Sequence, residues 1–234
     1  RNKGTNFMKQ VIMKGKRKTD NMDILEIIKS RHSVRQYKDQ PIEQEKRVAI
    51  NACVNEINTE SGLAIQVFYE EPKCFDSFMA HYGKFENVKN YIVIVGGRDE
   101  QEKAGYYGEK LVLKCQELGL NTCWVAMTHG KSQAQIKRGQ KLLIIISLGY
   151  GVTQGVPHKS KPMEELGYAD RETDWFATGM EAVCLAPTAV NQQKFFFECK
   201  DGMVTAKSLG GFYSNIDLGI AKYHFEAVTG HEVK

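Results

Sequence analysis

The sequence lacks the motifs that would mark a zinc site, a serine hydrolase or a membrane protein. Its six cysteines form no CxxC pair and no Cys/His metal spacing, and neither HExxH nor GxSxG occurs. No apolar run is longer than that of Leu142–Ile146, which is far shorter than the roughly 18 residues of a membrane span. We therefore expect no metal, no membrane partner and, because no secretion signal is found, reduced thiols in a cytoplasmic protein.

Acidic residues are missing from the first 18 positions, which hold seven lysines and arginines. Removing these seven from the total of 32 leaves 25 basic against 28 acidic side chains, so the body of the chain is mildly acidic. This balance gives little support to a nucleic-acid partner. A basic run of this kind is more often a solvated tail than a nucleic-acid arm, so we expect residues 1–22 to be a disordered tail or an expression remnant.

Helix-like and strand-like patterns alternate along the rest of the chain, which predicts an α+β fold with a sheet covered by helices. In the helix that should open at Pro41, we expect Val48, Ala49, Ala52 and Cys53 to form one apolar face. The other predicted helices are 23–31, 105–118, 173–186 and 215–229, and the predicted strands are 64–70, 90–95, 122–127, 142–148 and 194–199.

Two stretches of the chain, 49–70 and 178–198, share one order of features. Each has an apolar helix-like part, a small polar turn, a glutamine and an aromatic strand. Only the first follows a basic loop, Arg31–Arg35, and only the second contains the segment Pro187–Gln193. We interpret residues 23–234 as a single domain with pseudo-repeated halves. The two halves span about 23–168 and 169–234.

Two loops combine cations with a hydroxyl group. The segment RHSVRQY at 31–37 suits an anionic ligand, because arginine offers forked donors and serine a compact one. The same residues equally suit a solvated helix end, whose cations complement the helix dipole. The second loop, His158–Pro162, would alone be read as surface, but two such loops in a mildly acidic body favour a phosphate site.

A glycine-rich segment, Gly149–Gly155, follows the predicted strand 142–148 and superficially resembles a dinucleotide-binding turn. Its spacing is GxGxxxG rather than GxGxxG, and Pro157 and Pro162 interrupt the helix that such a turn requires. We reject this interpretation, since a Rossmann phosphate site needs a helix N-terminus at this point.

Taken in order, these segments resemble the FMN-dependent nitroreductase superfamily, most closely its single-chain bacterial branch with a fused second half. RHSVRQY resembles the family's opening RxSxR loop, and Ser61–Gln66 lies where its S-x-x-N-x-Q segment belongs. Tyr106–Ala126 resembles the long central helix and GLGTCW turn, and His158–Leu166 the late basic segment. The resemblance implies a nitroreductase-like fold with a central, mainly antiparallel sheet and an internal pseudo-dimer, so that a monomer is plausible.

The resemblance also implies a cofactor and a reaction. FMN would take a hydride from NAD(P)H at flavin N5 and pass it to a nitroaromatic, a quinone or a similar small-molecule acceptor. Because the cofactor does this chemistry, no protein acid or base is obligatory and we nominate no catalytic side chain. The cofactor-binding residues that the resemblance implies are Arg31, His32, Ser33, Arg35, Val125, Ala126, Met127, Lys159, Lys161, Pro187, Thr188, Ala189, Asn191 and Gln193.

The two copies of the repeat are not equivalent. The first has Ala64 where the family usually has asparagine, and no RxSxR loop precedes the second. The resemblance therefore implies one complete flavin site rather than two. An alternative remains open, namely a non-catalytic flavin-binding or sensing protein on the same fold, which would bind FMN without NAD(P)H turnover.

Overall fold

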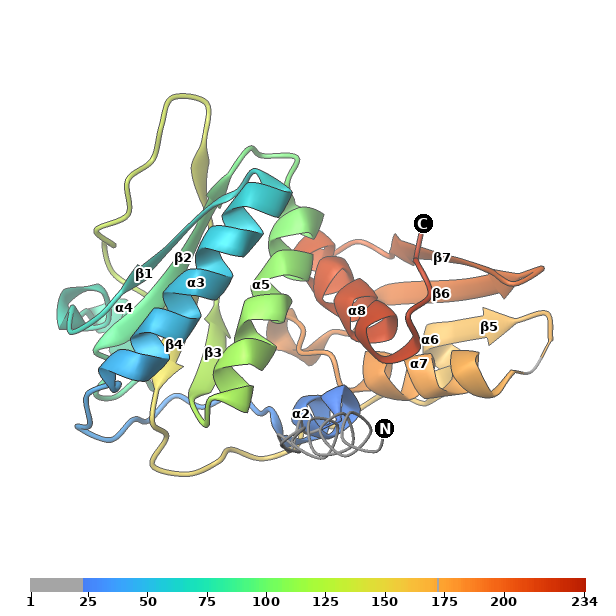
Figure 1. Ribbon diagram of the computed structural model, residues 1–234, viewed down its shortest axis with the longest axis horizontal. Coiled ribbons are helices and arrows are strands. Elements are labelled where there is room, and N and C mark those ends of the chain that lie inside the picture. Colours follow the sequence, from blue (N-terminus) through green and yellow to red (C-terminus); the bar gives the residue numbers. More distant parts are fainter. Residues whose placement is uncertain (1–22, 172) are drawn as a thin grey trace, which may run out of the picture.

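The structure is a computed structural model that describes residues 23–171 and 173–234 (Figure 1). The predicted basic tail, residues 1–22, lies outside the described residues. The helices are α2 (Ile24–Ser30), α3 (Gln44–Ser61), η1 (Pro72–Cys74), α4 (Phe78–Tyr82), α5 (Gln101–Glu117), α6 (Met163–Leu166), α7 (Asp174–Cys184), η2 (Ala189–Asn191) and α8 (Ser214–Thr229). The strands are β1 (Ala64–Phe68), β2 (Asn90–Gly96), β3 (Asn121–Val125), β4 (Lys141–Gly149), β5 (Gly167–Ala169), β6 (Phe195–Lys200) and β7 (Met203–Ser208).

A four-stranded sheet with the order β1-β2-β4-β3 forms the larger part of the molecule, and all its neighbouring strands are antiparallel. Successive side chains of a strand point to opposite faces. In β2, Ile92 and Ile94 join the core beneath α3 and α5, whereas Tyr91 and Val93 join a second core on the other face. The predicted α+β fold, with an antiparallel sheet covered by helices, is confirmed.

The smaller part of the molecule contains a three-stranded sheet with the order β5-β6-β7. Strand β5 runs parallel to β6, and β6 runs antiparallel to β7 (Figure 1). A helix, an antiparallel strand pair and a second helix therefore occur in the same order twice, as α3, β1, β2, α5 and as α7, β6, β7, α8. The side chain of Gln66 bonds the backbone of Gln135, and that of Gln193 bonds the backbones of Lys159 and Lys161. The expected repeat thus has matching elements, although the internal pseudo-dimer itself stays a prediction.

Helices α5 and α8 cross at two glycines, and this contact joins the two parts of the molecule. A Cβ atom at Gly105 would lie 2.0 Å from the carbonyl oxygen of Ile216, and one at Gly219 would lie 1.9 Å from that of Glu102. Each glycine therefore contacts the backbone of the other helix, at the residue three positions before that helix's own glycine. Such reciprocal contacts are the pattern that a two-fold axis produces.

The structure corrects the predicted inner face of α3. Its buried residues are Ile50, Val54, Ile57 and Ser61, whereas the side chain of Val48 is 58% exposed. Of the other residues expected on this face, Ala52 is exposed, whereas Cys53 packs half-buried against the core. The large apolar residues Ile50, Val54 and Ile57, at spacings of four and three, turn a different stripe of the helix toward the sheet. Strand β7 was not predicted, since half of its sequence MVTAKS is polar and only Val204 is buried.

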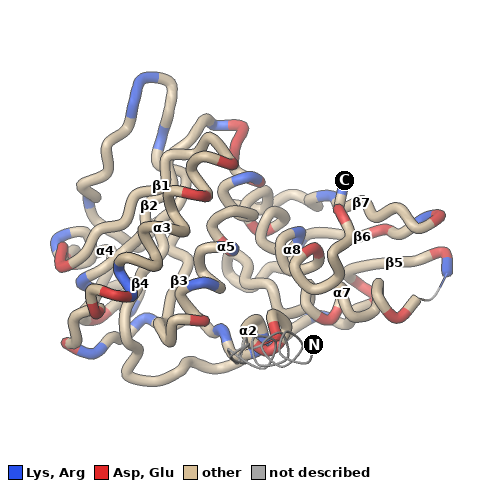
Figure 2. The backbone as a smooth tube through the Cα atoms, viewed as in Figure 1, with Lys and Arg blue, Asp and Glu red and all other residues tan. Residues whose placement is uncertain are grey.

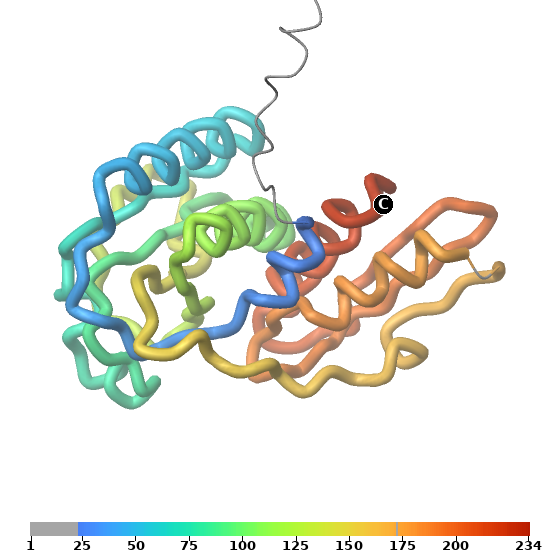
Figure 3. The backbone as a smooth tube through the Cα atoms, turned by 60° about the horizontal axis from the view of Figure 1, so that its bottom comes forward, coloured from blue at the N-terminus to red at the C-terminus, as the bar shows by residue number. Residues whose placement is uncertain are grey.

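The segment that follows α2, from Arg31 to Lys38, runs beside the loop that follows β4 (Figure 3). Backbone hydrogen bonds join Lys38 to Tyr150 and Val152 to Gln36, which holds the two segments together. No helix begins between the end of β4 and α6, so the rejection of a dinucleotide-binding turn at Gly149–Gly155 is confirmed for this described stretch. Across residues 23–171 and 173–234, none of the helices has the length and apolar character needed to cross a membrane.

Replacing Gly219 with alanine should destabilise the protein by about 3 kcal/mol or more, because the added methyl group meets backbone that cannot move aside. Helix propensity alone would favour alanine by about 1 kcal/mol. Gly139→Ala is the control, since its φ of +86° is strained for alanine but no atom lies within 4 Å of the new Cβ. Urea unfolding measures both changes, and equal losses would contradict the tight crossing.

Candidate functional site

The segment Arg31–Arg35 lies extended along β3. Ser33 pairs with Thr122 in a parallel bridge, and the Val34 amide donates to the Thr122 carbonyl at 3.0 Å. In an extended chain alternate side chains share a face. Arg31, Ser33 and Arg35 therefore turn toward the space between the two parts of the molecule, while Val34 is buried in the core beneath the sheet.

Two adjoining cavities fill this space. The first, here called the apolar cavity, measures about 290 Å³, and its lining residues are Ser33, Arg35, Cys123, Trp124, Ala126, Met127, Thr128, Ile144, Pro187, Thr188, Ala189, Val190, Phe212, Tyr213, Ile216, Asp217 and Ile220. The second, here called the basic cavity, measures about 340 Å³, and its lining residues are Arg31, His32, Ser33, Arg35, Val156, Pro157, His158, Pro187, Thr188, Val190 and Asn191. The residues that line both cavities place them side by side, with walls from both parts of the molecule.

Arg31 is the most unusual group in the basic cavity. Its side chain is only 2% exposed, yet Nε and Nη1 have no hydrogen-bond partner within the described residues. The nearest carboxylate oxygen, Glu109 Oε1, lies 3.7 Å from Nε. A buried guanidinium with free donors is costly unless a ligand satisfies them, so this group is suited to an anion.

Two histidines complete the basic cavity. Burial lowers the pKa of His32, and the charge of Arg31 lowers it further, while its buried Nδ1 atom has no partner in the part of the chain that the structure describes. Burial also lowers the pKa of His158, whose Nε2 lies 3.1 Å from the Cys184 carbonyl oxygen. Both rings are therefore neutral near pH 7, and an anion placed in the cavity would favour their protonation.

The wall formed by residues 187–193 has a strained backbone. Val190, Asn191 and Gln193 have φ angles of 47°, 54° and 45°, a region that a β-branched residue such as valine rarely adopts. Strain of this kind persists only where the surroundings hold it, and it is frequent at ligand sites. Here the Thr188 hydroxyl accepts from the Gln193 amide at 3.1 Å, and the Asn191 side chain donates to the Lys159 carbonyl at 2.9 Å.

Asp217 braces the same loop from the first turn of α8. One carboxylate oxygen accepts from the Ala189 amide at 2.9 Å, and the other accepts from the Gln192 side chain at 2.7 Å. Burial raises the pKa of Asp217 to about 6, although these two donors act in the opposite direction. The apolar cavity thus contains one carboxyl group that titrates within the physiological range.

The structure brings most of the predicted site residues together. Arg31, His32 and Asn191 line the basic cavity, Ala126, Met127 and Ala189 line the apolar cavity, and the shared wall contains Ser33, Arg35, Pro187 and Thr188.

Four predicted residues line neither cavity. Val125 faces the opposite core, because it alternates with Trp124 along β3. Lys159 is exposed, and the ammonium group of Lys161 bonds the Gln193 carbonyl at 3.2 Å. Gln193 is buried, and its side-chain amide forms hydrogen bonds with the backbones of Lys159 and Lys161. It therefore stabilises the loop without lining either cavity.

Several lining residues were not predicted from the sequence. The largest group lies on α8 and the turn before it: Phe212, Tyr213, Ile216, Asp217 and Ile220. One signal could have identified it, since an acidic residue within the apolar run Ile216–Ala221 is unusual for a helix facing a core. His158 was part of a predicted basic loop, but it was not singled out as a contact.

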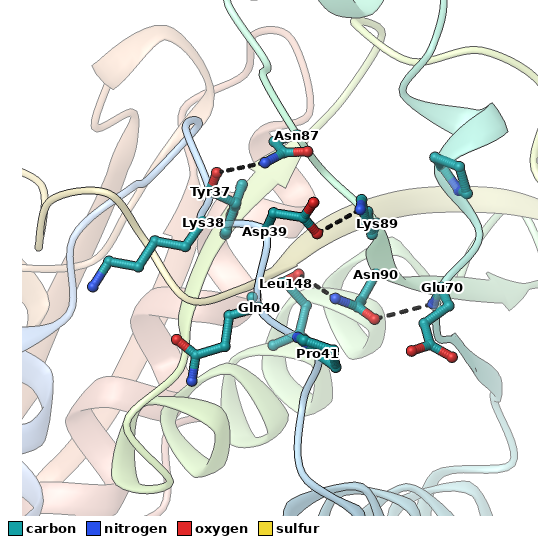
Figure 4. Close-up of a pocket in the computed structure, with 12 residues that line it drawn as sticks. Tyr37, Lys38, Asp39, Gln40, Pro41, Glu70, Asn87, Lys89, Asn90 and Leu148 are labelled. Carbon is teal, nitrogen blue, oxygen red and sulfur yellow. Dashed lines mark hydrogen bonds and ion pairs between the residues drawn. The ribbon is translucent and has the colours of Figure 1, made fainter.

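A third cavity, of about 280 Å³, lies at a different place, between the loop after Tyr37 and the start of β2 (Figure 4). Several of its polar side chains already have partners within the protein. Lys89 pairs with Asp39 at 2.5 Å, and the Asn90 amide bridges the backbones of Glu70 and Leu148. This cavity therefore offers a ligand much less than the basic cavity, where donors lack partners.

The model of a family described as "Putative TM nitroreductase" matches residues 23–229. The chain belongs to this nitroreductase family. A "putative nitroreductase" from Thermotoga maritima is 23% identical, with a TM-score of 0.64, over 88% of this chain and 83% of that chain. At this level of identity, the likeness shows that the two nitroreductase-family proteins share a fold.

Other solved structures are less similar. A "putative nitroreductase" in complex with FMN from Desulfovibrio desulfuricans is 18% identical over 61% of this chain and 93% of that chain, with a TM-score of 0.49. An FMN-dependent nitroreductase from Clostridium difficile is 21% identical over 60% of this chain and 92% of that chain, with a TM-score of 0.44. No curated protein sequence matches the chain.

The raised pKa of Asp217 should make the stability of the protein pH-dependent. The folded protein binds the Asp217 proton more tightly than the unfolded chain does. The stabilisation of the folded state that results is present below about pH 4 and is lost as the pH rises to about 6. Between about pH 4.5 and pH 7, the free energy of unfolding should fall by about 2 kcal/mol more in the wild type than in Asp217→Asn. Urea unfolding measures the difference, with Asp174→Asn, an exposed site on α7, as control. A difference that stays constant with pH would contradict the assignment.

Proposed function

We propose that this protein is an FMN-dependent oxidoreductase that transfers a hydride from NAD(P)H to a nitroaromatic, a quinone or a similar acceptor. Membership of the nitroreductase family supports this reaction class. The observation that carries the proposal for this chain is Arg31, a buried guanidinium in the basic cavity whose Nε and Nη1 have no partner among the described residues, beside an adjoining apolar cavity. Such a site is suited to a flat ring system linked to a phosphate.

The basic cavity fits the phosphate end of FMN. Arg31 offers Nε and Nη1, His32 offers a free Nδ1, and Arg35 and Ser33 line the same walls. Arginine is the preferred partner for phosphate because its planar donors match two oxygens at once. A bound phosphate would satisfy donors that the folded chain leaves buried and unpaired, which favours binding by more than the charge attraction alone.

The apolar cavity fits the ring end of the cofactor. Trp124, Ile144 and Ile220 provide apolar walls, and Ser33 and Arg35 place polar groups at its junction with the basic cavity. When bound, FMN supplies the hydride-accepting atom, and the chain supplies binding, orientation and electrostatics. The Arg35 cation at this junction would stabilise negative charge that develops on a reduced ring.

The mouth of the apolar cavity suits apolar, planar reactants. Met127, Val190 and Phe212 line it with side chains that are 58%, 87% and 46% exposed. Exposed apolar groups gathered at a cavity mark a place where a partner or ligand covers them. The nicotinamide and the acceptor would bind there in turn, so that each reaches the same ring and water is excluded while it does.

Replacing Arg31 with alanine should weaken FMN binding roughly 10- to 100-fold, the effect of losing hydrogen bonds between charged groups. Riboflavin, which has the same ring but no phosphate, should lose no more than about threefold. Flavin fluorescence titration measures both Kd values, and Arg138→Ala, on the loop between β3 and β4, is the control. Equal losses for the two ligands would show that Arg31 does not contact the phosphate.

Anaerobic mixing with NADH or NADPH tests the reaction itself. We expect the visible flavin band of the FMN-loaded protein to bleach with at least one donor and to return when a quinone or nitroaromatic is added. This outcome would also identify the preferred donor. Bound FMN that neither nucleotide bleaches would instead favour a flavin-binding or sensing role on this fold.

A further inference from the structure

A buried hydrogen-bonded cluster lies directly behind the proposed cofactor site. Glu109 on α5 and His224 on α8 are both fully buried, and Glu109 Oε1 lies 3.0 Å from His224 Nε2. The second carboxylate oxygen accepts from Trp124 Nε1 at 2.9 Å. Arg31 Nε lies 3.7 Å from Oε1, so the cluster reaches both the basic cavity and the wall of the apolar cavity.

The hydrogen bonds of His224 determine the charge of this cluster. Nδ1 lies 2.9 Å from the Ala182 carbonyl oxygen, which can only accept, and Nε2 faces the carboxylate of Glu109. Each of these two contacts needs a proton. One proton lies on Nδ1, and a second is shared between Nε2 and Glu109 Oε1, so the two side chains together carry no net charge. Burial raises the pKa of Glu109, but the hydrogen bond from His224 and the nearby Arg31 cation outweigh it and hold that pKa below its ordinary value.

Arg31 therefore provides the net charge of the cluster, and Glu109 Oε1 is the carboxylate oxygen nearest to its guanidinium. The contact is too long for a hydrogen bond, so it orients the guanidinium without using its donors. Nε and Nη1 remain available to a ligand.

We propose that the Glu109–His224 pair is a positioning pair that holds Arg31 ready for the phosphate of the cofactor. The inference rests on the proposed function, since it assigns a purpose to residues that do not touch either cavity. Glu109 comes from α5, whereas His224 comes from α8 and is held by α7, so the guanidinium is placed by elements of both parts of the molecule. Fixing a long side chain in advance removes part of the entropic cost of binding.

Glu109→Gln tests this role with little disturbance of charge or shape. The glutamine oxygen can accept from Trp124, and its amide can donate to a neutral His224 that still donates from Nδ1 to Ala182. Because the glutamate and histidine shared one proton, the glutamine and a neutral histidine also carry no net charge. The variant therefore changes one feature above all: an N–H group, instead of a carboxylate oxygen, faces Arg31 Nε.

We expect Glu109→Gln to weaken FMN binding about tenfold, equivalent to about 1.4 kcal/mol, while the riboflavin Kd changes less than about twofold. Glu226→Gln is the matched control. It makes the same substitution on α8, where the carboxylate binds Tyr106 and the Val233 backbone and has no contact with Arg31. This control should leave both Kd values unchanged. A purely structural role would weaken both ligands alike.

A double-mutant cycle with Arg31→Ala decides whether Glu109 acts through Arg31. In the Arg31→Ala background, Glu109→Gln should have no further effect on the ratio of the FMN and riboflavin Kd values. Additive effects would overturn the inference while leaving the proposed function intact. A wild-type protein that binds neither flavin would instead overturn the proposed function, and this inference with it.

If Glu109→Gln does not fold, as judged by circular dichroism, His224→Gln carries the test. It keeps an N–H donor for Glu109 but removes the shared proton, so the carboxylate charge is left with Arg31 as its neighbouring cation. The FMN-to-riboflavin preference should fall by at least as much as in Glu109→Gln. An unchanged preference in this folded variant would overturn the inference.

Discussion

The close crossing of α5 and α8 is the contact on which the rest of the structure depends. Glycine at positions 105 and 219 lets the two helices meet backbone to backbone, which no other residue would allow. The same helices carry Glu109, Asp217 and His224 to the borders of the site. A third glycine, Gly108, leaves room for the ring of Trp124 against α5, so helix packing also sets a wall of the apolar cavity.

The buried charges of the site differ in whether the protein itself satisfies their hydrogen bonds. The carboxylates of Glu109 and Asp217 accept hydrogen bonds from the protein on both oxygens, and each supports an element that lines the site. The cation of Arg31 is buried as deeply but keeps free donors. Along the backbone, acidic and basic positions are interspersed, apart from basic residues near the tip of the loop between β3 and β4 (Figure 2).

The sequence predicted elements and their order better than the directions of individual side chains. The Arg31–Arg35 loop was singled out by its residue types and Pro187–Asn191 through the family resemblance, and both line the site. The family resemblance also implied Val125, Lys159 and Lys161, which line neither cavity. Alternation along β3 points Val125 to the opposite core, Lys159 is exposed, and the Lys161 ammonium group bonds a backbone carbonyl.

The buried partners could not be predicted from the sequence, because Glu109 and His224 lie more than a hundred residues apart. Only the crossing of α5 and α8 brings them together. Glu109 stands within an amphipathic helix where an acidic residue would ordinarily face water. The pairing of distant helices is a tertiary property, and helical periodicity within one segment carries no information about it.

The crossing also has a consequence for protein synthesis: since Arg31 is made early and α8 late, the site cannot assemble on a nascent chain until α8 has left the ribosome.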